Sequence, residues 1–137
     1  MQRRASIIVL KDNLVLLVKL KDQDKLLPRA TWVFPFINLT EESSPRKEIN
    51  DFLGGMMVSY KLTDRVFKYV PSENPKLTYF VYVADYIKGG PEVSHFFQSY
   101  KWVPIKDIVA YSTSFMDDHV SKYLNEVAEK REKFKNL

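Results

Sequence analysis

The chain has 137 residues, of which 45% are hydrophobic and 28% charged, and these values are typical of one soluble globular domain. It contains no cysteine, which excludes disulfides, cysteine-ligated zinc and thiol catalysis. The net charge of +4 favours an anionic partner, such as a nucleotide, RNA or a phosphorylated metabolite, and is equally typical of ordinary solubility charge. The apolar run over residues 5–10 is too short for a signal peptide or a membrane span, so we predict a single cytoplasmic domain over residues 1–137 without membrane association.

The first predicted element is a β-hairpin over residues 3–20, because two β-rich stretches flank the turn formers Lys11-Asp12-Asn13. Its runs over residues 7–10 and 14–18 are continuously apolar, which indicates strands covered on both faces by helices. A short strand over residues 31–35 is expected to stop at its proline, and a loop is expected to follow.

A helix is predicted to begin at Pro45, with Ser44 as its N-cap and Glu48 in its first turn. The pair Gly54-Gly55 is expected to loosen or end it. Apolar residues at three- and four-residue spacing form one face suited to packing on a sheet: Ile49, Phe52, Leu53 and Met56. Residues 57–70 alternate loosely between apolar and polar, and residues 77–87 form the clearest strand of the chain.

Another strand is predicted over residues 96–103, followed by a turn or short helical piece over residues 104–108 and by the segment 111–116. From Asp117 the pattern is helical, with acids at the start and lysines near the end, as the helix dipole favours. The apolar positions of this helix are Val120, Tyr123, Leu124, Val127 and Phe134. The order of elements predicts an α+β domain with a mixed sheet flanked by helices.

Three segments, taken in order, resemble the Nudix family. They are the hairpin of residues 3–20, the segment Trp32-Val33-Phe34-Pro35 with the helix after it, and the late segment Lys101-Trp102-Val103-Pro104. The family pattern runs from an apolar hairpin, through a tryptophan-containing strand that ends in proline, to a loop-helix-loop box and a tryptophan-valine-proline strand end. The resemblance implies a Nudix-type α/β/α sandwich and an enzyme that hydrolyses nucleoside diphosphate derivatives with Mg²⁺ or Mn²⁺.

The family box reads G-x5-E-x7-R-E-U-x-E-E-x-G-U, and its carboxylates hold the divalent metal that binds the pyrophosphate. The best register places residues 47–54 on R-E-U-x-E-E-x-G, after a three-residue deletion relative to Glu42. The resemblance then implies Glu48 and Asp51 as catalytic acids, both of them also metal ligands together with Glu42. It places Lys47 on the box arginine, as a candidate substrate-binding residue without the planar guanidinium fork.

The chain departs from the family pattern at three places. The glycines that follow the strand proline are replaced by Phe36 and Ile37, and the second glutamate of the acidic pair is replaced by Phe52. Where family members often carry acids before the late tryptophan strand, this chain has His95-Phe96-Phe97-Gln98. A register without the deletion, which puts Asn50-Asp51 on the arginine-glutamate pair, fits worse chemically. In either register the full metal set is missing.

Simpler interpretations exist for the candidate residues. Glu48 and Asp51 are also typical of a solvated helix face, and Glu42 is typical of an ordinary helix lead-in. A basic edge near the hairpin contains the candidate substrate-binding residues Arg4 and Lys19, and it is either anion-attracting or a solvated rim. Its members are Arg3, Arg4, Lys19, Lys21, Lys25 and Arg29.

Two functions follow, and the eroded box favours the first. One is a noncatalytic or weakly active module that binds a nucleotide, another phosphorylated small molecule, RNA or a protein. The alternative is a divergent hydrolase of nucleoside diphosphate-linked compounds that needs Mg²⁺ or Mn²⁺. Catalysis predicts that Glu42, Glu48 and Asp51 converge on an open cleft, whereas a binding module predicts that they diverge beside a basic or aromatic cleft. A structural subunit would instead expose an apolar patch at Phe36-Ile37 or Phe96-Phe97.

Overall fold

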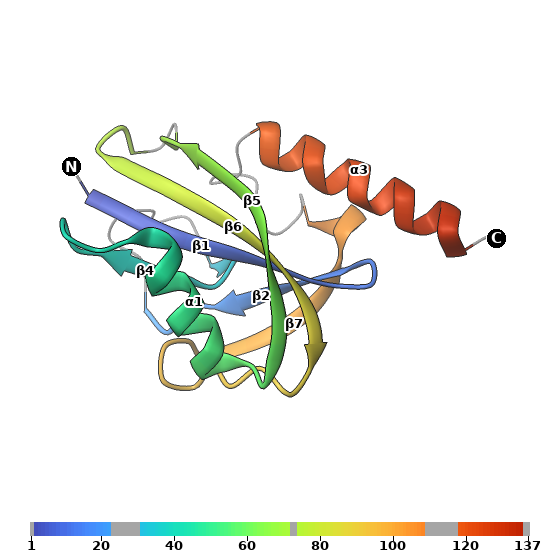
Figure 1. Cartoon of the computed structure of the whole chain (residues 1–137), viewed down its shortest axis with the longest axis horizontal. Coiled ribbons are helices and arrows are strands. Elements are labelled where there is room, and N and C mark those ends of the chain that lie inside the picture. Colours follow the sequence, from blue (N-terminus) through green and yellow to red (C-terminus); the bar gives the residue numbers. More distant parts are fainter. Residues whose placement is uncertain (1, 23–30, 72–73, 109–117, 136–137) are drawn as a thin grey trace.

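One mixed seven-stranded sheet, flanked by helices, organises the chain in a computed structural model that describes residues 2–22, 31–71, 74–108 and 118–135 (Figure 1). Its strands are β1 (Gln2–Lys11), β2 (Leu14–Lys19), β3 (Trp32–Val33), β4 (Phe36–Leu39), β5 (Ser59–Tyr69), β6 (Leu77–Lys88) and β7 (Ser99–Pro104). The helices are α1 (Pro45–Met56), the short 3-10 helix η1 (Ile105–Asp107) and α3 (Asp118–Lys135). This architecture confirms the predicted α+β class and the mixed sheet between helices.

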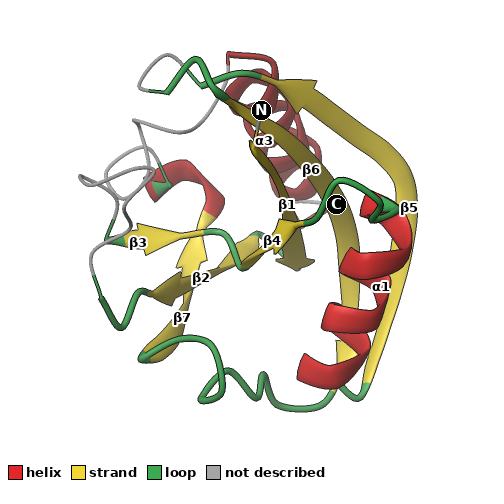
Figure 2. Cartoon of the chain, turned by 90° about the vertical axis from the view of Figure 1, so that its left-hand side faces the viewer, coloured by secondary structure: helices red, strands yellow, loops and turns green. Residues whose placement is uncertain are grey.

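The central strand β1 divides the sheet into two leaves (Figure 2). Along one edge β1 pairs in parallel with β6, and β6 pairs with β5. Its other edge is shared, because β4 pairs with residues 3–6 of β1 while β2 pairs with residues 10–11. Between these two partners the Ile7 amide donates to the Pro35 carbonyl at 3.0 Å. The strands β2 and β4 therefore split away from each other along β1.

The predicted hairpin is confirmed by the antiparallel pair of β1 and β2. Asp12 takes a left-handed φ of 55° in the turn, a conformation that aspartate tolerates better than most side chains. Residues 7–10 and 15–18 are fully or almost fully buried, as their continuous apolar runs predict. These runs lie at the centre of the hydrophobic core.

Two predicted boundaries are wrong. The segment after Pro35 is the strand β4 and not a loop, because the proline stands where the chain stops pairing with β2 and starts pairing with β1. A proline lacks an N–H donor, but its carbonyl still accepts a bond from β1. The late strand begins at Ser99 and not at Phe96, because the amides of Phe96 and Phe97 both donate to the Val93 carbonyl in a turn.

Helix α1 begins at the predicted Pro45, with Ser44 at the N-cap position but without a side-chain capping bond. It buries the four predicted apolar residues against the sheet. The helix runs through Gly54-Gly55 and ends at Met56, one residue beyond the pair. The Met56 carbonyl accepts the Glu92 amide at 2.8 Å, which ties the loop of residues 89–98 to the end of the helix.

The loop of residues 89–98 leaves β6 at Gly89, whose φ of +104° suits glycine. A Cβ atom at this position would lie 2.5 Å from the Cβ of Val58, so the backbones approach too closely for a side chain. At its far end the Gln98 amide donates to the Lys19 carbonyl at 2.9 Å. The loop is thus attached to both α1 and the end of β2.

Helix α3 confirms the predicted C-terminal helix and covers the other face of the β1-β6-β5 leaf from α1 (Figure 2). Val120 and Leu124 are buried, and Arg131 lies 3.6 Å from the Asp85 carboxylate of β6. The predicted segment 111–116 and the side chain of Phe134 lie outside the described residues. Neither helix, as far as it is described, is long and apolar enough to cross a membrane.

Candidate functional site

The three acids predicted as metal ligands stand on exposed or half-buried surface. Glu42 lies in the exposed lead-in to α1, Asp51 is exposed on the helix, and Glu48 is half-buried between them. Among the residues that the structure describes, no three His, Asp or Glu side chains are placed to hold a metal ion together. The donor set therefore does not fit the divalent ion that the family resemblance implies.

An aromatic cluster fills the region where the family pattern would place metal-binding groups. We define the phenylalanine cluster as Phe36, Phe52, Phe96 and Phe97. The Phe52 ring lies edge-on to Phe96 with a centroid distance of 5.3 Å and to Phe97 with 6.4 Å. Phe36 in turn meets Phe97 edge-on at 5.8 Å, a range that favours aromatic pairs.

The cluster joins all three departures from the family pattern. Phe36 replaces a glycine after the strand proline, Phe52 replaces a box glutamate, and Phe96-Phe97 stand where late acids are common. Phenyl rings carry no oxygen ligands, and apolar surroundings penalise an ion that must give up its hydration shell. The cluster thus substitutes hydrophobic packing for the charge that a metal centre would need.

A pocket opens beside this cluster, at the split between β2 and β4. We call it the β4-side pocket; its volume is about 500 Å³. It is lined by Arg4, Leu20, Lys21, Asp22, Phe36, Ile37, Asn38, Phe96 and Phe97. Phe96 is 59% exposed, whereas Phe97 is buried and Phe36 and Ile37 are half-buried. Of the two segments in which a structural subunit would expose an apolar patch, only this one ring is widely exposed.

Arg4 forms the floor of the β4-side pocket and is only 2% exposed. Its guanidinium carbon lies 4.0 Å from the centroid of the Phe36 ring. The guanidinium donates from Nε to Asn38 Oδ1 at 3.0 Å and from Nη1 to the Tyr79 hydroxyl at 3.2 Å. The sheet register produces this arrangement, because Arg4 of β1 stands opposite Asn38 of β4 and Tyr79 of β6. Arginine stays protonated, so a fixed positive charge lies under the pocket.

The other basic candidates lie in different places. Lys19 and Lys47 are not among the described residues that line the pocket, and Lys47 is exposed on α1. Lys21 lines the pocket and donates from Nζ to the Ser94 carbonyl at 2.6 Å. Arg3 instead donates to backbone carbonyls in the lead-in to α1, and Lys25 and Arg29 lie outside the described residues. The predicted basic edge therefore contributes Arg4 and Lys21 to the pocket.

Two further residues near the pocket were not singled out by the sequence. Asn38 lies in β4, in the segment for which the sequence predicts a loop, and the β-rich run Phe36-Ile37-Asn38-Leu39 is the signal that indicates the strand. Glu92 is an acid shortly before the late strand, but its carboxylate accepts the hydroxyl and the amide of Ser94 at 2.5 Å and 3.1 Å. These hydrogen bonds from Ser94 lower the pKa of Glu92, and they engage its carboxylate in the turn.

Known structures resemble this architecture over almost its whole length. An Ap4A hydrolase from C. elegans matches with a TM-score of 0.67 and 12% identity, covering 94% of this chain and 96% of that chain. A MutT protein studied from Aliivibrio salmonicida and Vibrio cholerae matches with a TM-score of 0.58 and 16% identity, covering 90% and 94%. An ADP-ribose pyrophosphatase from Streptococcus suis matches with a TM-score of 0.64 and 12% identity, covering 93% and 91%.

By sequence, no family model and no curated protein matches the chain. At such low identities the structural likeness establishes the fold and leaves the activity open. The hairpin, the box-like helix α1 and the tryptophan-containing strand β7 stand in the order that the sequence resemblance predicts. The chain is therefore a Nudix-fold protein.

Proposed function

We propose that this chain is a noncatalytic or weakly active Nudix-fold module that binds a nucleotide or another phosphorylated small molecule in the β4-side pocket. The observation that carries the proposal is the phenylalanine cluster, in which Phe52 stands in place of a box glutamate and packs against Phe96 and Phe97, which stand where late acids are common. The acids Glu42, Glu48 and Asp51 do not replace that chemistry, since the described residues include no three-ligand group.

The pocket offers complementary groups for a nucleotide. The exposed ring of Phe96 supplies a face on which a base can stack, and Lys21 and the buried Arg4 supply positive charge for a phosphate. The carboxylate of Asp22 would repel a phosphate placed next to it, so we assign it to the sugar side, where it can accept a ribose hydroxyl. The names of two similar structures, an Ap4A hydrolase and an ADP-ribose pyrophosphatase, refer to nucleotide compounds and support this ligand class.

Calorimetric titration of ADP-ribose, with and without Mg²⁺ or Mn²⁺, tests the proposal alongside a turnover assay that detects AMP and ribose 5-phosphate by chromatography. We expect saturable binding that does not require the metal, and no turnover above background. Phe96→Ala should weaken binding about tenfold or more, because stacking of a base on an aromatic ring contributes about 1–3 kcal/mol. Tyr100→Ala is the matched control, since Tyr100 is also an exposed aromatic residue, 42% exposed, but does not line the pocket.

Two outcomes would contradict the proposal. Saturable metal binding and turnover that both disappear in Glu48→Gln would identify a divergent Mg²⁺-dependent hydrolase with a reduced ligand set. If the folded protein did not bind the nucleotide, this ligand class would be excluded, and RNA or a protein would be left as the predicted partner classes.

A further inference from the structure

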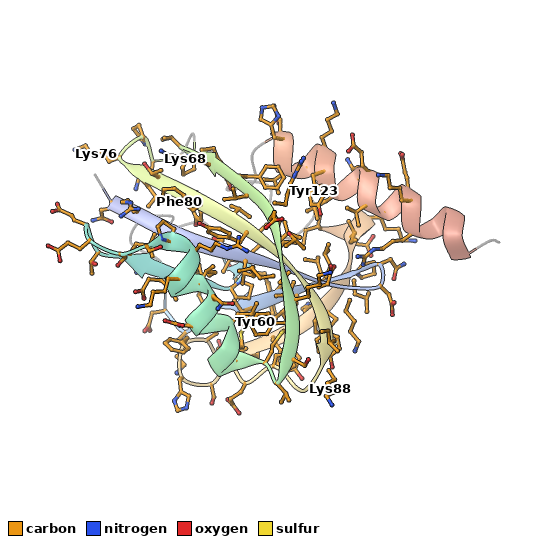
Figure 3. The ribbon with its side chains drawn as sticks, in the orientation of Figure 1. Tyr60, Lys68, Lys76, Phe80, Lys88 and Tyr123 are labelled. Carbon is orange, nitrogen blue, oxygen red and sulfur yellow. The ribbon has the colours of Figure 1, made fainter. Side chains whose placement is uncertain are left out.

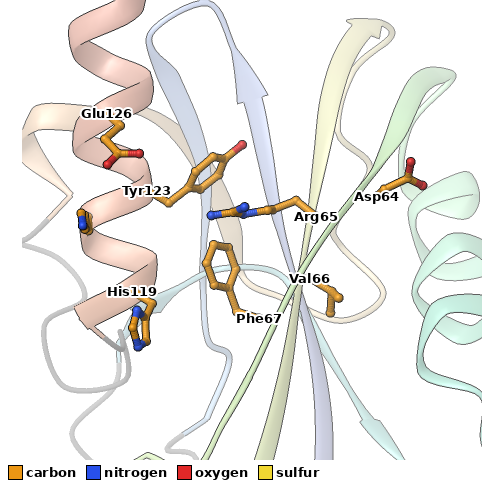
Figure 4. Close-up of a pocket in the computed structure, with 8 residues that line it drawn as sticks. Asp64, Arg65, Val66, Phe67, His119, Tyr123 and Glu126 are labelled. Carbon is orange, nitrogen blue, oxygen red and sulfur yellow. The ribbon is translucent and has the colours of Figure 1, made fainter.

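A second pocket lies between strand β5 and helix α3, away from the β4-side pocket (Figure 4). We call it the β5–α3 pocket; its volume is about 540 Å³. Its principal lining residues are Arg65 and Phe67 of β5 and His119, Lys122, Tyr123 and Glu126 of α3. The described lining residues of the two pockets do not overlap. This second pocket is therefore a candidate site that the Nudix-box positions do not explain.

The Arg65 guanidinium lies against two aromatic rings that also contact each other (Figure 4). Its central carbon lies 5.1 Å from the centroid of Phe67 and 5.0 Å from that of Tyr123. The rings themselves are 5.6 Å apart, and Tyr123 reaches β5 from helix α3 (Figure 3). Such cation–π contacts hold the side chain in place while leaving its N–H donors available at the ring edges.

An irregularity in β5 gives Arg65 this direction. The pairing of β5 with β6 shifts register between Leu62 and Val66. Within the shift, the Arg65 amide donates to Thr63 Oγ1 at 3.2 Å, and that hydroxyl donates to the Val83 carbonyl of β6 at 2.8 Å. β-bulges turn a side chain away from its regular position and are common beside functional sites. The bulge is thus the backbone feature that presents the guanidinium to α3.

The lining of the β5–α3 pocket carries two cations, Arg65 and Lys122, and two acids, Asp64 and Glu126. Asp64 faces Arg46 of α1 at 3.9 Å, so its charge is partly offset outside the pocket. Within the described part of the chain, neither Arg65 nor Lys122 has a carboxylate within ion-pair distance. Glu126 follows Lys122 by four residues on α3 and is the remaining acid of the lining. Arg65 and Lys122 therefore line the pocket without an ion-pair partner in the described part of the chain, with Glu126 on the α3 side and the fully exposed Asp64 on the β5 side.

The bulge and Arg46 also make strand addition an unsuitable use for this edge. Arg46 of α1 donates from Nη1 to the Thr63 carbonyl at 3.2 Å, so its side chain already contacts the β5 backbone at this place. The bulge interrupts the regular ladder at the same place. A small ligand between β5 and α3 fits the geometry better than a β-strand from a partner.

We propose that the β5–α3 pocket binds a phosphorylated sugar. Its phosphate lies between Arg65 and Lys122, because a guanidinium fork and an ammonium group together match the several oxygens of a phosphate monoester. Its hydroxyl groups lie toward Glu126, whose carboxylate accepts hydrogen bonds but would repel a second phosphate. This site is separate from the β4-side pocket and does not depend on the function proposed for it.

Titration of the isotope-labelled protein with ribose 5-phosphate, followed by amide chemical shifts in NMR spectra, tests this assignment. We expect saturable shifts on β5 and α3, including those of Arg65 and Glu126, and no matching response to ribose alone. Arg65→Ala and Lys122→Ala should each weaken binding about tenfold, as expected when a charged hydrogen-bond donor is lost. Lys130→Ala is the matched control, because it removes the same charge from an exposed position of α3 outside the pocket.

These outcomes distinguish specific binding in the β5–α3 pocket from nonspecific attraction of a phosphate to the positive charges of α3. Equal weakening by Lys122→Ala and Lys130→Ala would overturn the proposal, and so would ribose binding as tightly as its phosphate. Inorganic phosphate that binds as tightly as ribose 5-phosphate would overturn the role of Glu126. The amide shifts of β5 and α3 report this site alone, whereas the Phe96→Ala comparison with ADP-ribose reports the β4-side pocket, so failure of one site and failure of the other are distinguishable.

Discussion

An arginine lies over a phenylalanine ring both at strand β4 and at strand β5, but only the first of these arginines is buried. At the β4 edge Arg4 stacks on Phe36 at 4.0 Å and is buried, with hydrogen bonds to Asn38 and Tyr79. At the β5 edge Arg65 lies over Phe67 at 5.1 Å and is exposed. A buried guanidinium that is already bonded contributes mainly to structure, whereas an exposed one keeps its donors for a ligand. Burial therefore decides which guanidinium can donate hydrogen bonds to a ligand, Arg65, and which contributes only its positive charge to a neighbouring pocket, Arg4.

The largest difference between the edges should be in stability. Phe52→Ala removes the ring that meets both Phe96 and Phe97, and it leaves a cavity in the phenylalanine cluster. We expect the free energy of unfolding to fall by about 3–5 kcal/mol, a range typical of deleting a buried phenylalanine. Urea unfolding followed by circular dichroism measures this change.

Shortening an apolar side chain at the β5 edge should lower the free energy of unfolding much less. Val66 lines the β5–α3 pocket and is 48% exposed, so Val66→Ala should change the free energy of unfolding by less than about 0.5 kcal/mol. Equal losses in the two variants would contradict the contrast, because they would place the same packing energy on both edges.

Most of the fold could be predicted from the sequence because its signals are local and strong. Continuous apolar runs identified β1 and β2, and a proline at N1 with apolar spacing identified α1. The strand β4 is not predictable in this way, because a proline after Trp32-Val33-Phe34 is typical of a strand end, whereas Pro35 marks a change of pairing partner from β2 to β1. Which neighbouring strand a segment pairs with depends on tertiary contacts, and a local sequence pattern does not predict them.

The candidate sites were only partly predictable. Each substitution at Phe36, Phe52 and Phe96 was visible in the sequence, but their contact depends on how the loop of residues 89–98 attaches to α1 and β2. The site around Arg65 gave no sequence signal, because it depends on a bulge in β5 and on the docking of α3. A sequence shows which residue stands at each position, but which of these residues contact one another depends on the fold.

A second, smaller contrast concerns the two arginines themselves. Arg4→Lys should lower the free energy of unfolding by about 1–3 kcal/mol, because lysine lacks the planar fork that bonds Asn38 and Tyr79 while stacking on Phe36. Arg65→Lys should cost less than about 1 kcal/mol, since exposed cation–π contacts are weak. Thermal and urea unfolding of both variants measure the pair. If Arg65→Lys lowered the free energy of unfolding more than Arg4→Lys, then Arg65 would be the arginine that stabilises the fold, and the contrast would be contradicted.

The smallest expected effect is a difference in alkaline stability. Burial raises the pKa of Tyr82 above its ordinary value of 10.0, against the opposing charges of Arg46 and Arg3. A pKa raised by folding means that this contribution to stability is complete below the unfolded-state pKa and is lost as the pH rises through the folded-state pKa. Between about pH 9 and 11 the free energy of unfolding should therefore fall less steeply in Tyr82→Phe than in the parent protein.

Tyr123 gives the same test at the β5–α3 pocket. Burial raises its pKa, and so does Asp85, while Arg65 and Arg131 lower it. Removing its hydroxyl in Tyr123→Phe should also flatten the alkaline decline, and Arg65→Ala should raise the pKa of Tyr123 by removing an opposing charge. Ultraviolet titration of the phenolate bands measures that change. An unchanged Tyr123 titration in Arg65→Ala would mean that the guanidinium does not lie over the ring in solution, and it would remove the geometry on which the phosphate site depends.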